Sequence, residues 1–408
     1  MSAGSLVRQG SVAYLLGICL VATLGGFLFG YDTAVISGAI GALQSRFDLG
    51  PTLKGWAASS ALLGCILGVV LAGPVSDRLG RRRALILAAV LFLVSALGTA
   101  FPRTLAEFVI FRIVGGIGVG IASMTSPMYI AEVSPRQIRG RMVSLNQFAI
   151  VFGMLVVYFV NYYISLQGDE AWNVARGWRW MFGSEALPAF ALMVLLFFVP
   201  PTPRWLVKQG RTSEARRILQ RIGGPQHAER ELDEIARTIS HKSESMAQLF
   251  RPGMRIALVI GVALAILQQV TGINVFLYYA PEIFKKLGSA ASSALLQTVV
   301  VGGVNMAFTL IAIWTVDTLG RKPLMIFGST GMAICLFALG LAASLHHIEA
   351  WALAFVLGYI ACFALSVGPV TWVILSEIFP TKIRGRAMAI ATFCLWTANF
   401  VVSQTFPM

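Results

Sequence analysis

Apolar runs of about twenty residues or more follow one another along almost the whole chain. A transmembrane helix needs about 20 predominantly apolar residues, and each run is close to that length or longer. The sequence therefore predicts an all-α membrane protein that crosses the bilayer many times. We count eleven such runs, at residues 12–40, 55–76, 84–102, 105–128, 142–165, 178–200, 256–283, 293–315, 323–345, 351–375 and 387–407.

The low charge content excludes a soluble globular protein. Only 12% of the 408 residues are charged and 57% are hydrophobic, whereas a soluble domain carries about 25% charged residues. The net charge of +14 does not indicate nucleic acid binding, because the basic residues concentrate in short loops between apolar runs. Such loops are typical of the cytoplasmic side of a membrane. We therefore expect a multi-pass protein of the plasma (inner) membrane with a cytoplasmic N-terminus.

No pattern in the sequence indicates an enzyme, a cofactor or a metal site. We find no P-loop, metal-ligand cluster or nucleophile triad. The five cysteines all lie inside apolar runs without metal-ligand spacing, and we interpret them as packing residues. The apolar run that follows Arg8 is too long for a signal peptide.

One long polar insert, 201–255, separates two groups of apolar runs. Within it, 211–222 and 230–239 have helical periodicity with charged faces, and the sequence Gly-Gly-Pro at 223–225 indicates a break. We expect short amphipathic helices at the cytoplasmic surface, with a flexible linker as the alternative. The predicted domains are an N-terminal six-helix bundle at 1–200, this linker at 201–255, and a C-terminal bundle at 256–408.

Two loop motifs occur twice. The motif Asp-x-Leu-Gly-Arg at 77–81 recurs at 317–321, and 132–141 recurs as 377–386, with offsets of 317 − 77 = 240 and 377 − 132 = 245. The repeats predict two pseudo-symmetric bundles. Because only one run follows 377–386, where two follow 132–141, a twelfth helix is expected to be missing from this chain.

Basic residues that only set the membrane topology do not explain why the acidic residues of these loops are repeated as well. Ion pairs that join helix ends can hold one conformation closed and release it in another, and a network is needed because an exposed pair contributes only about 0–1 kcal/mol. We predict a cytoplasmic gating network formed by Asp77, Arg81, Glu132, Arg139, Arg141, Asp317, Arg321, Glu377 and Arg384.

The seventh apolar run contains an unusual group of polar side chains, namely Gln268, Gln269, Asn274 and Tyr278. At 100° per residue three of them share an arc of about 120°, while Gln269 falls outside it. All four face one cavity only if the helix loosens, and Gly272 is where it can do so. Interhelical hydrogen bonding is the alternative. Four polar groups within eleven residues favour a cavity that accepts a hydroxyl-rich solute.

Other polar and aromatic positions inside the runs fit the same interpretation. Trp rings stack on the C–H faces of sugars and amides bridge neighbouring hydroxyls, although a single Trp more often packs or lies at an interface. Together with the seventh run, these positions predict a sugar site. They are Gln147, Asn305, Gly368, Trp372 and Trp396.

Two carboxylates and one cation lie at least seven residues from the ends of their apolar runs. Asp32 is in the first run, Arg112 in the fourth and Glu185 in the sixth. Charges at membrane depth are costly and are functional candidates by default. A carboxylate that alternates between an Arg partner and a proton couples proton movement to conformation. The alternative is a static salt bridge that fixes helix packing. Glu185 is a second proton candidate or part of a charge network.

The chain resembles the sugar porter family of the major facilitator superfamily, and the combination of matching segments is highly specific although each alone is weak. They span nearly the whole chain, at 30–38, 77–82, 112–120, 127–141, 203–206, 268–279, 317–323 and 368–386. The resemblance implies that the nine polar, glycine and tryptophan positions named above bind sugar, with Phe29 lining the site. It also implies that Asp32 and Arg112 form a proton-coupling pair, with Glu185 as an accessory proton site.

Two departures from the family are visible. Leu395 stands where a member of the family has a Gln before the tryptophan of the last run, so the sugar could differ. The usual Pro-Glu-Ser-Pro-Arg motif reads Pro-Thr-Pro-Arg at 201–204, without the Glu.

Facilitative relatives lack the acid at the position of Asp32, so the resemblance favours symport here. We expect proton-coupled import of a xylose- or hexose-type monosaccharide by alternating access, carried out by a functional monomer. A proton-independent facilitator and a non-transporting sugar sensor are the alternatives.

Overall fold

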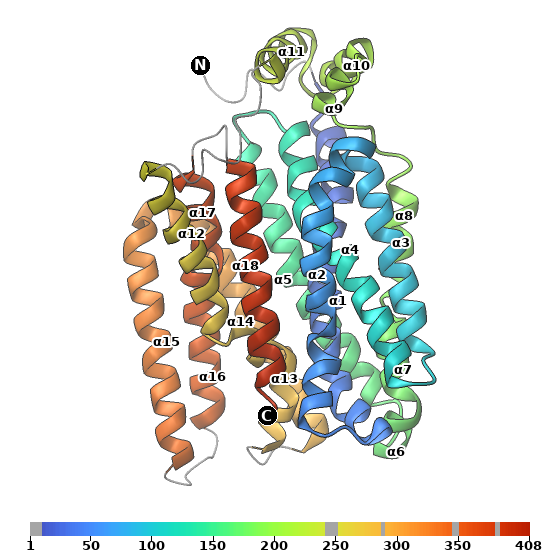
Figure 1. The fold of residues 1–408 in the computed structure, drawn as a ribbon, viewed down its shortest axis with the longest axis vertical. Coiled ribbons are helices and arrows are strands. Elements are labelled where there is room, and N and C mark those ends of the chain that lie inside the picture. The colour runs from blue at the N-terminus through green and yellow to red at the C-terminus, as the bar shows by residue number, and fades with distance from the viewer. Residues whose placement is uncertain (1–9, 241–251, 287–289, 345–350, 380–383) are drawn as a thin grey trace.

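The structure is a computed structural model that describes residues 10–240, 252–286, 290–344, 351–379 and 384–408. Every regular element within these residues is a helix. The long helices run along the long axis of the molecule in two groups, one formed by the first half of the chain and one by the second (Figure 1). The predicted fold class, an all-α membrane protein of two bundles, is confirmed.

The first bundle contains the helices before the polar insert. The side chain of Ser11 accepts a hydrogen bond from the Tyr14 N–H and so caps the first helix, which ends at Asp48 in a left-handed conformation with φ of 50°. The elements are α1 (Val12–Phe47), α2 (Pro51–Leu79), α3 (Arg81–Ala100), α4 (Leu105–Val133), α5 (Arg139–Ser165), α6 (Glu170–Trp172), the π-helix η2 (Asn173–Gly177), α7 (Trp178–Gly183) and α8 (Ala186–Leu195).

The second bundle follows the polar insert and contains two interrupted helices. A glycine separates α12 from α13, and a π-helical segment separates α16 from α17. Its elements are α12 (Pro252–Val270), α13 (Ile273–Lys286), α14 (Ala291–Leu319), α15 (Arg321–Ser344), α16 (Trp351–Cys362), the π-helix η4 (Phe363–Val367), α17 (Gly368–Ile378) and α18 (Arg384–Thr405).

Ten helical stretches of the described residues are long and apolar enough to cross a membrane. The predicted run 178–200 is not among them because α7 and α8 divide it at Ser184 and Glu185. The cause is Pro188, which has no N–H to donate to the Ser184 carbonyl one turn earlier. Instead Leu187 donates to that carbonyl in a tighter turn, at 3.3 Å. The break places Glu185 at a helix junction inside the bundle.

The predicted amphipathic helices of the insert are confirmed as α10 (Thr212–Gly223) and α11 (Pro225–Ser240), with Gly224 between them at φ of 84°. A short helix before them, α9 (Pro203–Lys208), was not predicted. The three helices bury a small apolar cluster of their own and lie at one end of the molecule (Figure 1). The Ser11 N–H donates to the Arg221 carbonyl at 3.0 Å, which ties the start of α1 to α10.

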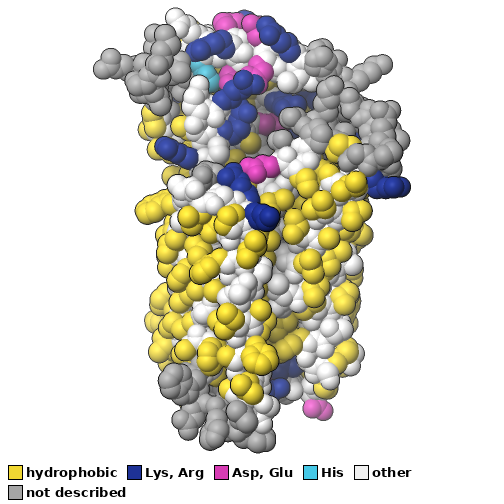
Figure 2. All heavy atoms as spheres, turned by 90° about the vertical axis from the view of Figure 1, so that its left-hand side faces the viewer, with side chains coloured by type: hydrophobic (Ala, Val, Ile, Leu, Met, Phe, Trp, Pro, Cys, Tyr) yellow, Lys and Arg dark blue, Asp and Glu magenta, His cyan; other side chains and the backbone are white. Residues whose placement is uncertain are grey.

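Hydrophobic side chains cover the long lateral face, while most charged side chains gather toward the α9–α11 end (Figure 2). Buried apolar side chains of both bundles form one cluster. Polar contacts also connect the bundles: the Tyr158 hydroxyl of α5 donates to the Leu277 carbonyl of α13 at 3.0 Å. The two halves of the chain therefore pack directly against each other.

Candidate functional site

Three carboxamides of the seventh run form a hydrogen-bonded chain at the junction of α12 and α13. The Asn274 amide donates to Gln269 Oε1 at 2.5 Å, and the Gln269 amide donates to Gln268 Oε1 at 3.3 Å. Gln268 and Gln269 are buried, and Asn274 is half-buried. These amides satisfy one another and leave the remaining donors and acceptors of Asn274 and Gln269 for a solute.

The backbone at Gly272 explains how these amides come together. Gly272 has φ of 85°, a left-handed conformation that favours glycine, and it ends the regular hydrogen bonding of α12. The Thr271 hydroxyl donates to the Gln268 carbonyl at 2.7 Å, and the Tyr359 hydroxyl donates to the Thr271 carbonyl at 2.8 Å. The predicted loosening at Gly272 is confirmed, and it brings Gln269 into the group although an ideal helix would point it elsewhere.

Gln268 connects this junction to the second interrupted helix. Its amide donates to the carbonyls of Val367 at 3.1 Å and Gly368 at 2.8 Å, where η4 meets α17. Pro369 at the start of α17 lacks an N–H and favours such a break. Gln268 therefore holds two irregular segments together, and its donors are occupied by backbone rather than free for a ligand.

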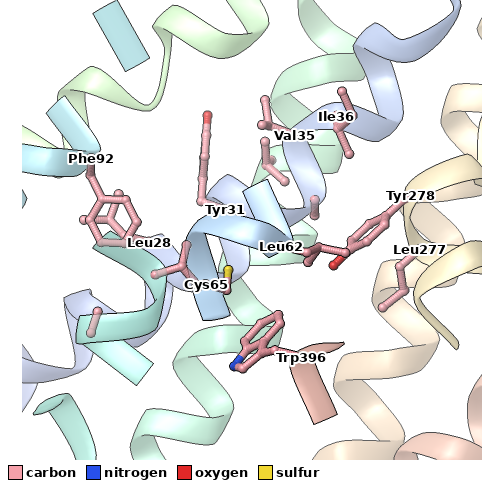
Figure 3. Close-up of a cluster of buried hydrophobic side chains, with 14 of the residues drawn as sticks. Leu28, Tyr31, Val35, Ile36, Leu62, Cys65, Phe92, Leu277, Tyr278 and Trp396 are labelled. Carbon is pink, nitrogen blue, oxygen red and sulfur yellow. The ribbon is translucent and has the colours of Figure 1, made fainter. Parts of the chain in front are cut away.

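Aromatic side chains from both bundles meet beside the amide group. The rings of Phe29 on α1 and Trp396 on α18 are 5.6 Å apart. Tyr278 on α13 is buried and lies close to Asn399 on α18. Figure 3 shows Trp396 and Tyr278 from the second bundle on one side of Leu62 and Cys65 from the first. The predicted residues Phe29, Tyr278 and Trp396 thus lie at the contact between the two halves.

Three further predicted sugar-site residues lie on three different helices. Gln147 on α5 and Trp372 on α17 are half-buried, and Asn305 on α14 is buried. A cavity of about 310 Å³ contacts Gln268, but α12 and α15 supply most of its lining, so it lies within the second bundle. Membership of Gln147, Asn305 and Trp372 in one sugar site stays a prediction.

Asp32 and Arg112 form a fully buried ion pair. Arg112 Nη1 lies 2.8 Å from Asp32 Oδ1 and also donates to the Asp32 carbonyl at 3.2 Å. Their side chains are 0% and 1% exposed, so neither charge is stabilised by bulk water. The ring of Phe182 lies 5.5 Å from the guanidinium carbon. The predicted proximity of the acid and the cation is confirmed.

Glu185 joins this pair. It is buried, and its carboxyl lies within hydrogen-bonding reach of Asp32. Among the residues that the structure describes, Asp32 Oδ2 and Glu185 Oε1 have no N–H or O–H donor. Two carboxylates cannot donate to each other, so a hydrogen bond between them requires a proton on one of them. The site therefore contains two buried acids and one guanidinium.

The acid group and the aromatic group are neighbours. Tyr278 is close enough to Asp32 and Arg112 to interact with their charges, and so is the buried Cys65. Cys65, which the sequence analysis interpreted as a packing residue, is completely buried in the apolar core.

The predicted gating residues form local ion pairs near the α9–α11 end. Arg81 contacts Glu132 at 3.0 Å and Asp77 at 3.2 Å. Arg321 contacts Glu377 at 2.8 Å in the equivalent part of the second bundle. Both pairs join helices within one bundle, α3 with α4 and α15 with α17.

Arg139 and Arg141, which were also predicted, lie outside these ion pairs among the described residues. Arg139 donates to the Ser134 carbonyl at 3.3 Å, and Arg141 is exposed. The side chains of Asp317 and Arg384 lie outside the described residues. Lys208 of α9 lies 3.8 Å from Asp77, a contact that the sequence did not predict.

Polar residues that sequence reasoning missed lie at the end of the molecule opposite α9–α11. Lys54 contacts Glu282 at 2.8 Å, and the Ser59 hydroxyl donates to Gln404 at 2.8 Å. They were missed because charged residues near span ends are usually loop or surface residues, and their spacing along the chain gives no sign of pairing.

The comparisons with known proteins cover nearly the whole chain. Residues 18–408 match the family described as sugar (and other) transporter. The chain is 49% identical to the D-xylose-proton symporter of Escherichia coli (strain K12), over 98% of this chain and 87% of that protein. It is 42% identical to the arabinose-proton symporter of Bacillus subtilis (strain 168), over 99% and 87%.

Solved structures agree with the sequence comparisons. A partially occluded inward open conformation of the xylose transporter XylE from E. coli matches with a TM-score of 0.88 and 48% identity, over 97% of this chain and 91% of that one. An inward open conformation of the same transporter matches with a TM-score of 0.85 and 47% identity, over 96% and 89%.

Proposed function

The chain belongs to the sugar transporter family, and from that premise we propose that it imports a monosaccharide together with a proton by alternating access. The observation that carries the proton part is the buried group of Asp32, Arg112 and Glu185, with Tyr278 beside it. The sugar part rests on the amide chain of Gln268, Gln269 and Asn274 and on similarity to sugar–proton symporters.

The charges suggest how the proton acts. Ionised Asp32 attracts Arg112, and this holds α1 against α4 inside the first bundle. Protonation of Asp32 removes its charge and weakens that attraction, since the pair is shielded from water. Arg112 is then free to reorient, and Glu185 is placed to take or supply the proton. In this proposal the proton and the sugar together permit the change between outward- and inward-facing states.

Amides and aromatic rings suit a monosaccharide of the xylose or hexose type. Asn274 and Gln269 keep unused donors and acceptors for hydroxyl groups, while the indole of Trp396 offers an apolar face beside Phe29. Leu395, which is buried, cannot donate the hydrogen bond that a Gln would offer there. We therefore propose that the preferred sugar makes one polar contact fewer near α18 than the sugar of the family member with Gln.

The orientation and domain division are part of the proposal. The basic residues favour a plasma (inner) membrane protein whose α9–α11 end and N-terminus are cytoplasmic. We divide the chain into bundles at 1–200 and 256–408 joined by a linker at 201–255. We also propose that the protein functions as a monomer.

Replacement of Asp32 tests the proposed coupling. In Asp32→Asn the side chain keeps its shape but neither ionises nor carries an exchangeable acidic proton. We expect proteoliposomes with this variant to lose accumulation of labelled xylose against its gradient, while counterflow exchange of the sugar continues. Asp48→Asn, which makes the same change at the exposed end of the same helix, should accumulate sugar as the wild type does. Unchanged accumulation by Asp32→Asn would refute the coupling role. If the wild type and Asp32→Asn show equal downhill uptake that does not respond to pH, the protein is a facilitator.

A further inference from the structure

The two bundles are bridged by charged and polar side chains at the end opposite α9–α11. Lys54, in the first turns of α2, lies 2.8 Å from Glu282 of α13. Its ammonium group also donates to Gln44 of α1 at 2.7 Å. The side chains of Lys54 and Glu282 are only 13% and 19% exposed. This pair is therefore shielded from water much more than an ordinary surface pair, and it connects the two halves of the chain.

The local structure makes room for this contact. Glu282 follows Pro281 within α13 and faces α1 at Gly41. A Cβ at Gly41 would lie 2.8 Å from Glu282 Oε1 and 3.3 Å from Lys285 Nζ, so any larger residue would push the carboxylate away. Lys285 contacts the same carboxylate at 3.3 Å, but from the same helix.

A second bridge lies beside the first. The Ser59 hydroxyl of α2 donates to Gln404 Oε1 of α18 at 2.8 Å. The Gln404 amide in turn donates to the Thr52 carbonyl, again on α2, at 3.1 Å. Ser59 is completely buried. The start of α2 is thus held by polar groups of two helices from the second bundle, and we call Lys54, Glu282, Ser59, Gln404 and Thr52 the outer clasp.

The clasp differs from the ion pairs at the other end of the molecule. Arg81 with Glu132, and Arg321 with Glu377, each join helices of a single bundle, so they are retained if the bundles rotate as rigid units. Lys54 and Glu282 belong to different bundles and must separate if this end opens. Separation leaves two charges to be hydrated and breaks the contacts of Gln404.

We propose that the outer clasp holds the outer end of the transporter closed and thereby sets the ratio of inward- to outward-facing molecules. This inference rests on the proposed alternating access, but not on the identity of the sugar or on proton coupling. Loss of one charged hydrogen bond should shift the ratio by about tenfold toward the outward-facing state, which corresponds to about 1.4 kcal/mol.

Hydrogen–deuterium exchange on the purified protein tests the clasp through Lys54→Met, which removes the charge and retains an apolar chain of similar length. We expect amides in 51–60 and 276–286 to exchange about tenfold faster than in the wild type, and amides near 132–142 to exchange more slowly. A fold that is merely destabilised would exchange faster at both ends. The matched control is Lys285→Met, which removes the other lysine on the Glu282 carboxylate but no link between bundles, and should exchange as the wild type does.

A double substitution that swaps the two charges provides the second variant. Lys54→Glu combined with Glu282→Lys restores an attractive pair across the same contact and should return exchange toward the wild-type pattern. The proposal is overturned if Lys54→Met exchanges as the wild type does, if both ends exchange faster, or if Lys285→Met has the same effect. These readouts need no transport, so a wild-type protein that moves sugar without protons would refute the proton coupling and leave the clasp intact.

Discussion

Gln268 is expected to support the sugar site chiefly through the backbone, which makes Gln268→Ala an informative change. The variant removes two hydrogen bonds, to the carbonyls of Val367 and Gly368, and it removes the acceptor of the Gln269 amide. An intramolecular hydrogen bond contributes about 0.5–1.5 kcal/mol net. The two carbonyl contacts together therefore stabilise the junction of α12 and α17 by about 1–3 kcal/mol.

Sugar affinity should fall for the same reason. Without Gln268, the Gln269 amide is no longer held, and Gln269 no longer positions Asn274. We expect binding to weaken by about 1–3 kcal/mol, or about 5- to 150-fold in Kd. Isothermal titration of the purified protein with xylose and with glucose measures this change. Gln209→Ala, at an exposed position of the chain, is the control.

The outcome separates two interpretations of Gln268. A weaker Kd together with a lower unfolding temperature supports a residue that holds both the fold and the site. An unchanged Kd in a folded protein would refute the assignment of the amide chain to the sugar site. Gln269 and Asn274 would then have lost the support of Gln268 with no effect on sugar binding.

Two further changes test the supports of the site. Gly272→Ala should destabilise the protein by about 1 kcal/mol through backbone strain alone, since φ is 85° and a Cβ would meet nothing within 4 Å; an unchanged unfolding free energy would contradict the strained junction. Glu132→Gln should cost about 1–3 kcal/mol because Arg81 loses the better buried of its two charged partners. Asp77→Asn, whose side chain is 55% exposed, should cost less than about 1 kcal/mol in the same thermal unfolding assay. Equal effects of the two substitutions would show that burial does not strengthen the Glu132 contact.

The sequence predicted the class of fold and most helices because apolar length is a strong signal. The repeated loop motifs likewise indicated two bundles, and the Gly-Gly-Pro break between α10 and α11 was located correctly. The sequence predicted the apolar run at 178–200 but not its division into α7 and α8, because a proline inside an apolar run bends some helices and divides others.

The site was predicted in part for similar reasons. Charged residues inside apolar runs stand out, so Asp32, Arg112 and Glu185 were found before their contacts were known. Pairing across the bundles could not be deduced, since Lys54 and Glu282 are 228 residues apart and each resembles an ordinary charge at a span end. Nor could the sequence reveal that the Gln268 donors are directed to backbone carbonyls, because that depends on the break at η4.

The most direct test of the account follows proton and sugar movement together. Wild-type protein in liposomes, with a weakly buffered external medium and no imposed gradient, should alkalinise that medium when xylose or another transported sugar is added, because each sugar enters with a proton. The Asp32→Asn variant should exchange the sugar without any change in external pH. Uptake of sugar by the wild type with no accompanying proton movement would contradict the coupling that we assign to Asp32, Arg112 and Glu185.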